Sequence, residues 1–151
     1  MESALRTVES AARLRGVRLQ CNELDDLQVL GNELHLEQVF VNLLDNAVKF
    51  NRPNGEVQVE VRCTENTARI TISDTGIGIP SEDLPRVFER FYRVDKARSR
   101  EMGGTGLGLS IVRRVIDEHS GAVCAANRPR GGAVMSVELP GLPAGATRGG
   151  R

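Results

Sequence analysis

The sequence has few cysteines, no excess of either charge and no long apolar run. Three cysteines, an odd number whose spacing matches no metal-binding motif, argue against a disulfide framework and favour a reduced, cytosolic compartment. No apolar stretch approaches the length of a membrane span, and the N-terminus lacks the apolar region of a signal peptide. The 20 basic and 20 acidic residues cancel, so no overall field attracts the chain to nucleic acid or to a membrane surface. We therefore expect a cytosolic domain that contacts neither.

The length of 151 residues is enough for one domain with a proper core. Apolar periodicity predicts helices over residues 3–14 and 35–50, and a third that follows the glycines at 103–108 and ends near residue 119. Strict alternation predicts a hairpin of residues 56–63 and 68–74, and further strands are expected at 17–21, 27–30, 122–127 and 133–139. Hairpins beside helices that share one side indicate an α/β sandwich of the α+β class, in which a mixed, mostly antiparallel sheet packs on one layer of about three helices.

The segments outside these elements carry weaker signals. Ser81, with two acidic residues after it, is typical of a helix N-cap, and the apolar residues that follow would share one helical face; these are Leu84, Val87, Phe88 and Phe91. Residues 94–104 have few apolar anchors and several arginines, so we expect them to be disordered without a ligand. Residues 141–151 have no core residues and are predicted to form a disordered tail after a domain of residues 1–140.

The helix predicted at 35–50 has an unusual polar side. Its core stripe consists of Leu36, Phe40, Leu43, Leu44, Ala47 and Phe50, and its other side carries Gln38, Asn42, Asp45, Asn46 and Lys49. Asparagine is a poor helix former, so two asparagines one turn apart indicate that their carboxamides are used. Neutral oxygen ligands suit a hard cation such as Mg²⁺ beside phosphates. The alternative is an exposed face that tolerates asparagine.

Asp74 ends the strand predicted at 68–74, on the same face as Ala68, Ile70 and Ile72. If that face is the core, the carboxylate points inward and needs a hydrogen-bond donor. The exocyclic amine of adenine is such a donor, and glycines at 76 and 78 would let the backbone approach a flat base closely. The alternative is that Asp74 simply begins a turn.

The stretch GGTGLGLS at residues 103–110 opens a helix. Bare backbone N–H groups at a helix N-terminus favour a phosphate there. The stretch lacks the lysine of a P-loop, since Leu109 stands in its place, and it lacks the third glycine of a dinucleotide fingerprint. The preceding segment, residues 88–101, is rich in arginine, and Arg93 or a neighbour could contact a terminal phosphate. The alternatives are a flexible loop and a solvated charged segment.

Four motifs, NLLDNAVKF, DTGIGIP, VFERFYR and GGTGLGLSIV, occur in that order. Together they closely resemble the N, G1, F and G2 boxes of the ATP-binding catalytic domain of sensor histidine kinases. The resemblance covers residues 3–140 and implies the Bergerat fold, which gyrase-type ATPases and the Hsp90 chaperones share. It also implies that the cofactors are ATP and Mg²⁺.

The resemblance implies a role for each matching residue. Asn42 and Asn46 belong to the N box, with Asn46 the ligand of Mg²⁺ and Lys49 near the phosphates. Asp74 would accept the adenine amino group, in a base pocket that Phe50, Gly76, Gly78 and Ile79 help to form. Many relatives have a tyrosine at the position of Phe50. The phenylalanine can still stack on the base, but it cannot make the hydrogen bond of the phenolic hydroxyl.

The F and G2 boxes would act on the phosphates. Arg93 would approach the terminal phosphate, and residues 94–105 would form a mobile lid. Backbone contacts to phosphate would come from Gly104, Thr105, Gly106, Leu107 and Gly108. The residues expected to take part in catalysis are Asn42, Lys49 and Arg93.

The same resemblance favours phosphoryl transfer over hydrolysis. Gyrase-type and Hsp90-type ATPases have a water-activating glutamate at the position of Asn42. The acceptor histidine of a sensor kinase lies on a separate dimerisation domain, and neither His35 nor His119 has the expected sequence around it. The implied partners are this dimerisation domain and a response regulator, within a parent sensor anchored in the plasma membrane, whereas the isolated fragment would be a monomer. The alternatives are an ATPase, a serine kinase of the anti-sigma-factor kind and a non-catalytic nucleotide sensor.

Overall fold

The computed structural model describes residues 1–25, 28–64, 66–101 and 106–142. The helices are α1 (Glu2–Leu14), α2 (Glu33–Lys49), α3 (Lys96–Glu101) and α4 (Gly108–Glu118), with a 3-10 turn, η1, at Leu84–Arg86. The strands are β1 (Arg18–Leu24), β2 (Glu56–Thr64), β3 (Thr67–Asp74), β4 (Ala122–Asn127) and β5 (Ala133–Pro140). Among the helices described, none combines the length and the apolar character needed to cross a membrane.

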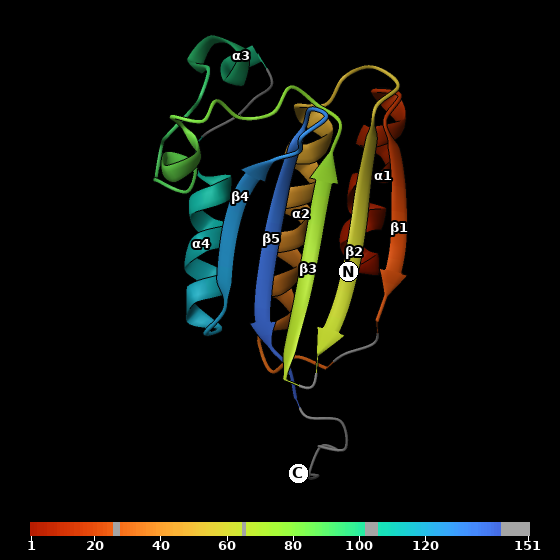
Figure 1. Ribbon diagram of the computed structural model, residues 1–151, viewed down its shortest axis with the longest axis vertical. Coiled ribbons are helices and arrows are strands. Elements are labelled where there is room, and N and C mark those ends of the chain that lie inside the picture. The colour runs from red at the N-terminus through yellow and green to blue at the C-terminus, as the bar shows by residue number, and fades with distance from the viewer. Residues whose placement is uncertain (26–27, 65, 102–105, 143–151) are drawn as a thin grey trace.

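The strands form one mixed sheet in the order β1-β2-β3-β5-β4, in which β1 and β2 are parallel and every other pair is antiparallel. Figure 1 shows α1, α2 and α4 as one layer against a single face of this sheet, with α3 set apart at one end. The predicted α/β sandwich is therefore confirmed. The core lies between the layers, where buried β3 residues Ala68, Ile70 and Ile72 face the buried side of α2.

The long helix α2 follows from its sequence. Asn32 caps its N-terminus, because the side-chain oxygen accepts a hydrogen bond from the His35 N–H at 3.1 Å. Val39, Phe40, Leu43, Leu44, Ala47 and Val48 are its buried residues, at spacings of three, four and one. The burial of this stripe leaves Asn42, Asp45, Asn46 and Lys49 together on a neighbouring face.

The strand predicted at 27–30 is wrong. Leu27 lies outside the described residues, and the rest of the run forms a single bridge, from Val29 to Gly141. Gly31 ends this run after four residues, which is too short for a ladder of hydrogen bonds to a neighbouring strand. Gly141 and Leu142 also donate hydrogen bonds from their N–H groups, to Asn66 O and Gln28 O at 2.9 Å. The remainder of the predicted tail, residues 143–151, lies outside the described residues.

The helix predicted after Ser81 is also wrong. Only η1 forms there, and its N-cap is Asp83 without a side-chain hydrogen bond. The expected helical face breaks up, because Phe91 has a φ of 61° and is 63% exposed. Tertiary contacts explain the change, since the Phe91 N–H donates to Gly106 O at 2.9 Å and joins this segment to the start of α4.

Disorder was expected over residues 94–104, yet α3 occupies Lys96–Glu101. Its sequence, KARSRE, contains mainly good helix formers, which the expectation undervalued. Residues 102–104 lie outside the described part of the chain.

Candidate functional site

A cavity of about 850 Å³ lies between α2, the end of β3 and the start of α4. The predicted site residues in its wall are Asn42, Asn46, Lys49, Phe50, Asp74, Gly78, Ile79, Arg93, Gly106 and Gly108. Two more described residues, Gly76 and Leu107, adjoin this wall without lining it: Gly76 follows Asp74 in the chain, and Leu107 is the N-cap of α4. Gly104 and Thr105 fall outside the described residues. The structure thus gathers residues from four separate motifs around one cavity.

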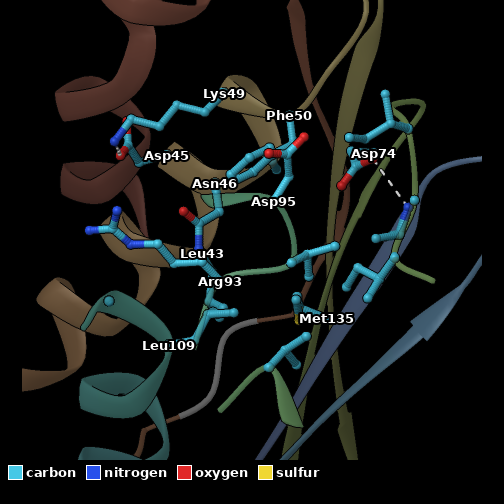
Figure 2. Close-up of a pocket in the computed structure, with 18 of the residues that line it drawn as sticks. Leu43, Asp45, Asn46, Lys49, Phe50, Asp74, Arg93, Asp95, Leu109 and Met135 are labelled. Carbon is cyan, nitrogen blue, oxygen red and sulfur yellow. Dashed lines mark hydrogen bonds and ion pairs between the residues drawn. The ribbon is translucent and has the colours of Figure 1, made fainter. Parts of the chain in front are cut away.

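Figure 2 shows how charge is distributed in the cavity. Lys49 and Arg93 lie at one end, with Asp45 beside Lys49, and Asp74 lies at the other. Asn46, Phe50 and Asp95 lie between them. The cavity therefore has a cationic end and an end where a single buried carboxylate stands among apolar residues. A ligand that fits both ends carries negative charge at one terminus and a flat group with a hydrogen-bond donor at the other.

The polar side of α2 supplies the middle of the cavity. Asn42, Asp45, Asn46 and Lys49 are half-buried there, whereas Gln38 is exposed and outside the wall. Lys49 Nζ forms an ion pair with Asp45 Oδ2 at 2.7 Å, one turn earlier on the helix. Asn42 Nδ2 donates to Gly108 O at 3.4 Å, which ties α2 to the first turn of α4. Among the described residues, none makes a hydrogen bond to the Asn46 carboxamide, which is thus available to a ligand.

Asp74 is 8% exposed, so it faces inward, and it also begins a turn. Its Oδ1 accepts the turn-forming hydrogen bond from the Gly76 N–H at 2.8 Å and a second from the Ala133 N–H at 3.1 Å. Burial raises the pKa of Asp74 above the ordinary carboxyl value, and these two N–H groups and the Arg128 charge oppose that shift. Oδ2 has no hydrogen-bond partner in the described part of the chain, so a ligand donor can reach it.

Gly76 allows the loop after β3 to pass close to the end of α2. A Cβ atom at this position would lie 2.2 Å from Phe50 O, a distance that no side chain tolerates. The Ile77 N–H donates to the same carbonyl at 3.2 Å. The loop and the end of α2 are therefore held together at Phe50, which lies between the two ends of the cavity.

The segment before α3 is held by polar contacts in place of a helix. The Tyr92 hydroxyl donates to Asp83, and the Arg86 guanidinium lies 4.6 Å from the centroid of the Tyr92 ring. Arg86 also pairs with Glu89 at 3.3 Å. These contacts place Arg93, the next residue, in the cavity wall.

Sequence reasoning missed part of the wall. Ala133 and Met135 of β5 line the cavity beside Ile72, because Met135 pairs with Ile72 across the sheet. Tyr92 and Asp95 line it as well. Strand alternation does put Ala133 and Met135 on one face, but only the β3–β5 register, which the sequence does not reveal, brings them to the cavity.

Comparisons with known proteins identify the family of the chain. A family profile described as histidine kinase-, DNA gyrase B- and HSP90-like ATPase matches residues 31–143. The chain is 38% identical over 126 residues to the signal transduction histidine-protein kinase BaeS of Escherichia coli K12. It is 44% identical over 117 residues to the sensor-like histidine kinase SenX3 of Mycolicibacterium smegmatis. These matches cover 83% and 77% of the chain but only 27% and 30% of the relatives, so the chain spans less than a third of their length.

Solved structures show the same likeness. A mycobacterial sensor histidine kinase, MprB, superposes with a TM-score of 0.81 at 34% identity, covering 95% of this chain and 96% of that one. Full-length ShkA in complex with AMPPNP gives a TM-score of 0.80 at 27% identity, over 96% of this chain and 30% of that one. Histidine kinase ThkA in complex with the response regulator protein TrrA gives 0.77 at 26% identity, over 94% and 39%.

Proposed function

The chain belongs to the histidine kinase-, DNA gyrase B- and HSP90-like ATPase family, and from this premise we propose that it binds Mg-ATP and donates the γ-phosphate to a histidine on a separate dimerisation domain. It would thus be the catalytic, ATP-binding part of a two-component sensor kinase. The observation that carries the proposal is the cavity of Figure 2, with the buried Asp74 carboxylate at one end and the cations Lys49 and Arg93 at the other.

The Asp74 end suits adenine. Oδ2 is the acceptor for the 6-amino group, while Oδ1 is already held by the Gly76 and Ala133 N–H groups. A base with a carbonyl in place of the amine would leave two acceptors facing each other, which a buried site rejects strongly. Phe50 and Ile79 supply apolar surface for the ring system. Support from a relative comes from the nucleotide analogue bound to ShkA.

The opposite end suits a triphosphate. Lys49 and Arg93 bring positive charge, and the backbone at Gly106, Leu107 and Gly108 opens helix α4. Asn46 would hold Mg²⁺, which neutralises phosphate charge when bound. The described residues contain no cluster of three or more His, Cys, Asp or Glu that could hold a metal. This donor set fits a hard cation that takes most of its ligands from phosphates and water.

Transfer is favoured over hydrolysis by the residue at position 42. Asn42 is a carboxamide, which cannot take a proton from water, and its Nδ2 is engaged with Gly108 O. The chain's own histidines are outside the cavity wall, and His119 is bonded to the backbone of Asn32 and Val115. The acceptor in this proposal is therefore external, on the dimerisation domain of the parent protein.

The proposal also covers the surroundings of the domain. The phosphoryl group would pass from the dimerisation domain to a response regulator, a class of partner that ThkA binds in its complex with TrrA. The parent would be a sensor anchored in the plasma membrane, with this part in the cytoplasm. Alone, the chain would be a monomer that binds ATP and hydrolyses it slowly.

A transfer assay tests the proposal. The chain is mixed with Mg²⁺, γ-labelled ATP and the dimerisation-domain fragment of its parent, and the label on that fragment is tested for acid lability. We expect acid-labile, alkali-stable label, and a loss of about tenfold or more for Asn46→Ala, which removes the proposed metal ligand. Gln38→Ala on the same helix, exposed and outside the cavity, is the matched control and should transfer at the wild-type rate.

Two results would overturn the assignment. Acid-stable label would show a hydroxyl ester and a serine kinase. Rapid ATP hydrolysis by the chain alone, abolished by Asn46→Asp, would show an ATPase.

A further inference from the structure

The turn between β4 and β5 contacts the loop that follows β3, although about fifty residues of chain separate them. Asn127, the last residue of β4, pairs with both backbone groups of Ile79: the Ile79 N–H donates to Oδ1 at 2.8 Å, and Nδ2 donates to Ile79 O at 2.5 Å. The next residue, Arg128, donates from Nη1 to Asp74 O at 3.1 Å. One turn therefore fixes both ends of the loop from Asp74 to Ile79.

The turn is itself well defined. The Arg128 N–H donates to Gly132 O at 2.9 Å, and the Gly131 N–H donates to Arg128 O at 3.1 Å. The chain then enters β5, where the Ala133 N–H donates to Asp74 Oδ1. Asp74 is thus held twice by this turn, once at its main-chain carbonyl through Arg128 and once at its carboxylate through Ala133.

The two halves of the loop depend on different partners. The first half is held by the body of the domain, because the Thr75 N–H donates to Glu56 O at 3.1 Å and the Ile77 N–H to Phe50 O at 3.2 Å. Among the described residues, the Asn127 carboxamide makes the hydrogen bonds with the backbone of Ile79. The part of the loop that lines the cavity at Ile79 is therefore placed by Asn127, which does not line the cavity itself.

We propose that Asn127 and Arg128 are positioning residues that set the base specificity of the nucleotide site. Asn127 holds Ile79 in the apolar wall, and Arg128 holds Asp74. Together they fix the distance between this wall and the carboxylate that accepts a hydrogen bond from the base. The inference rests on the proposed function, because it assigns adenine to the Asp74 end of the cavity. A loosened Ile79 would let the base tilt away from Asp74 Oδ2, so the 6-amino group would contribute less to binding.

The test compares two ligands on each variant. Dissociation constants are measured by calorimetry for ATP and for purine riboside triphosphate, which lacks the 6-amino group. The wild-type chain should prefer ATP by about tenfold or more, as expected for a hydrogen bond to a buried carboxylate. Asn127→Ala should weaken ATP by about fivefold to tenfold and leave the second ligand nearly unchanged, so that the preference collapses. Asn127→Asp, which keeps the acceptor for the Ile79 N–H, should keep an intermediate preference.

Matched variants separate positioning from a general loss of structure. Cys124→Ala, an exposed change on the same strand, should keep the wild-type preference. Arg128→Met, which removes the donor to Asp74 O, should reduce it. If Asn127→Ala is too unstable for calorimetry, Asn127→Asp replaces it, because its second oxygen stands where Nδ2 donates to Ile79 O, and a preference for ATP below that of the wild-type chain is expected.

The possible failures are distinct. A wild-type chain that does not prefer ATP refutes the proposed function at its base site. A wild-type preference that Asn127→Ala and Arg128→Met leave intact, with both ligands weakened equally, overturns the positioning role and leaves the proposed function standing. A preference for ATP in Asn127→Asp equal to that of the wild-type chain also overturns it.

Discussion

The imidazole of His119 joins the end of α4 to the start of α2, because its Nε2 accepts a hydrogen bond from the Asn32 N–H at 3.0 Å. Its Nδ1 lies 2.7 Å from Val115 O, which requires the proton on Nδ1 in a neutral ring. The chain passes close at this point, since a Cβ at Gly31 would lie 2.4 Å from His119 Cδ2. His119 is of the residue type that accepts phosphate in sensor kinases. Its hydrogen bonds make it a structural link between the two helices that flank the cavity.

Replacement of His119 should therefore lower stability without a direct effect on the nucleotide site. We expect His119→Ala to lower the free energy of unfolding by about 1–3 kcal/mol, since the Asn32 N–H loses its partner. Urea unfolding measures the change. His35→Ala, whose side chain is exposed beside the same N-cap, is the control and should stay within about 0.5 kcal/mol of the wild type. Equal losses in the two variants would contradict the role of the link.

Asp74→Asn should separate stability from binding. The carboxamide keeps an oxygen for the Gly76 and Ala133 N–H groups, but it offers the adenine amine another amine, so ATP should bind about 10- to 100-fold more weakly. Calorimetry at neutral pH checks this. Asp117→Asn, an exposed change on α4, should bind ATP as the wild type does.

The same residue predicts a pH dependence of folding. Burial raises the folded-state pKa of Asp74 above the ordinary 3.8, so its contribution to stability is present below that value and is lost as the pH rises through the folded pKa. The free energy of unfolding of the wild type, relative to Asp74→Asn, should therefore fall across that window. A relative stability that rises with pH would show that the two N–H groups and Arg128 outweigh the cost of burial.

The ion pair between Lys49 and Asp45 should compete with phosphate. Lys49 Nζ lies 2.7 Å from Asp45 Oδ2, so this carboxylate already neutralises part of the charge that a phosphate would meet. Asp45→Asn should therefore tighten ATP binding by about twofold to fivefold at low salt, and less at high salt. Asp117→Asn removes a comparable one-turn pair, with Arg113 on α4, and should leave affinity unchanged. Weaker binding of Asp45→Asn at low salt would mean that Asp45 positions Lys49 and does not restrain it.

The sequence predicted those parts of the fold whose pattern is local. The stripe on α2 and the alternation of β2 and β3 each identified a buried face, and the face of β3 carried Asp74 inward as expected. Asn42, Asn46 and Lys49 came together for the same reason, since residues at a spacing of three and four must share a helix face.

Two of the failures have the same physical cause, which is contact between distant segments. Ser81 and the residues after it have a helical pattern, but Pro85 stands inside the turn and the Tyr92–Asp83 hydrogen bond and the Phe91–Gly106 hydrogen bond select another path. Asn127 went unnoticed because a single asparagine at a strand end has an ordinary local explanation. Its pairing with Ile79 exists only once the sheet has formed.

Tyr92 is the one tyrosine in a chain without tryptophan, and its ring is part of the cavity wall. All of the tyrosine emission of this chain therefore originates at the cavity, from a hydroxyl that donates to the Asp83 carboxylate, an arrangement that quenches it. The contacts that hold the segment before α3 thus act as an optical reporter, so a ligand that breaks the Tyr92–Asp83 hydrogen bond should raise the emission of the unlabelled chain.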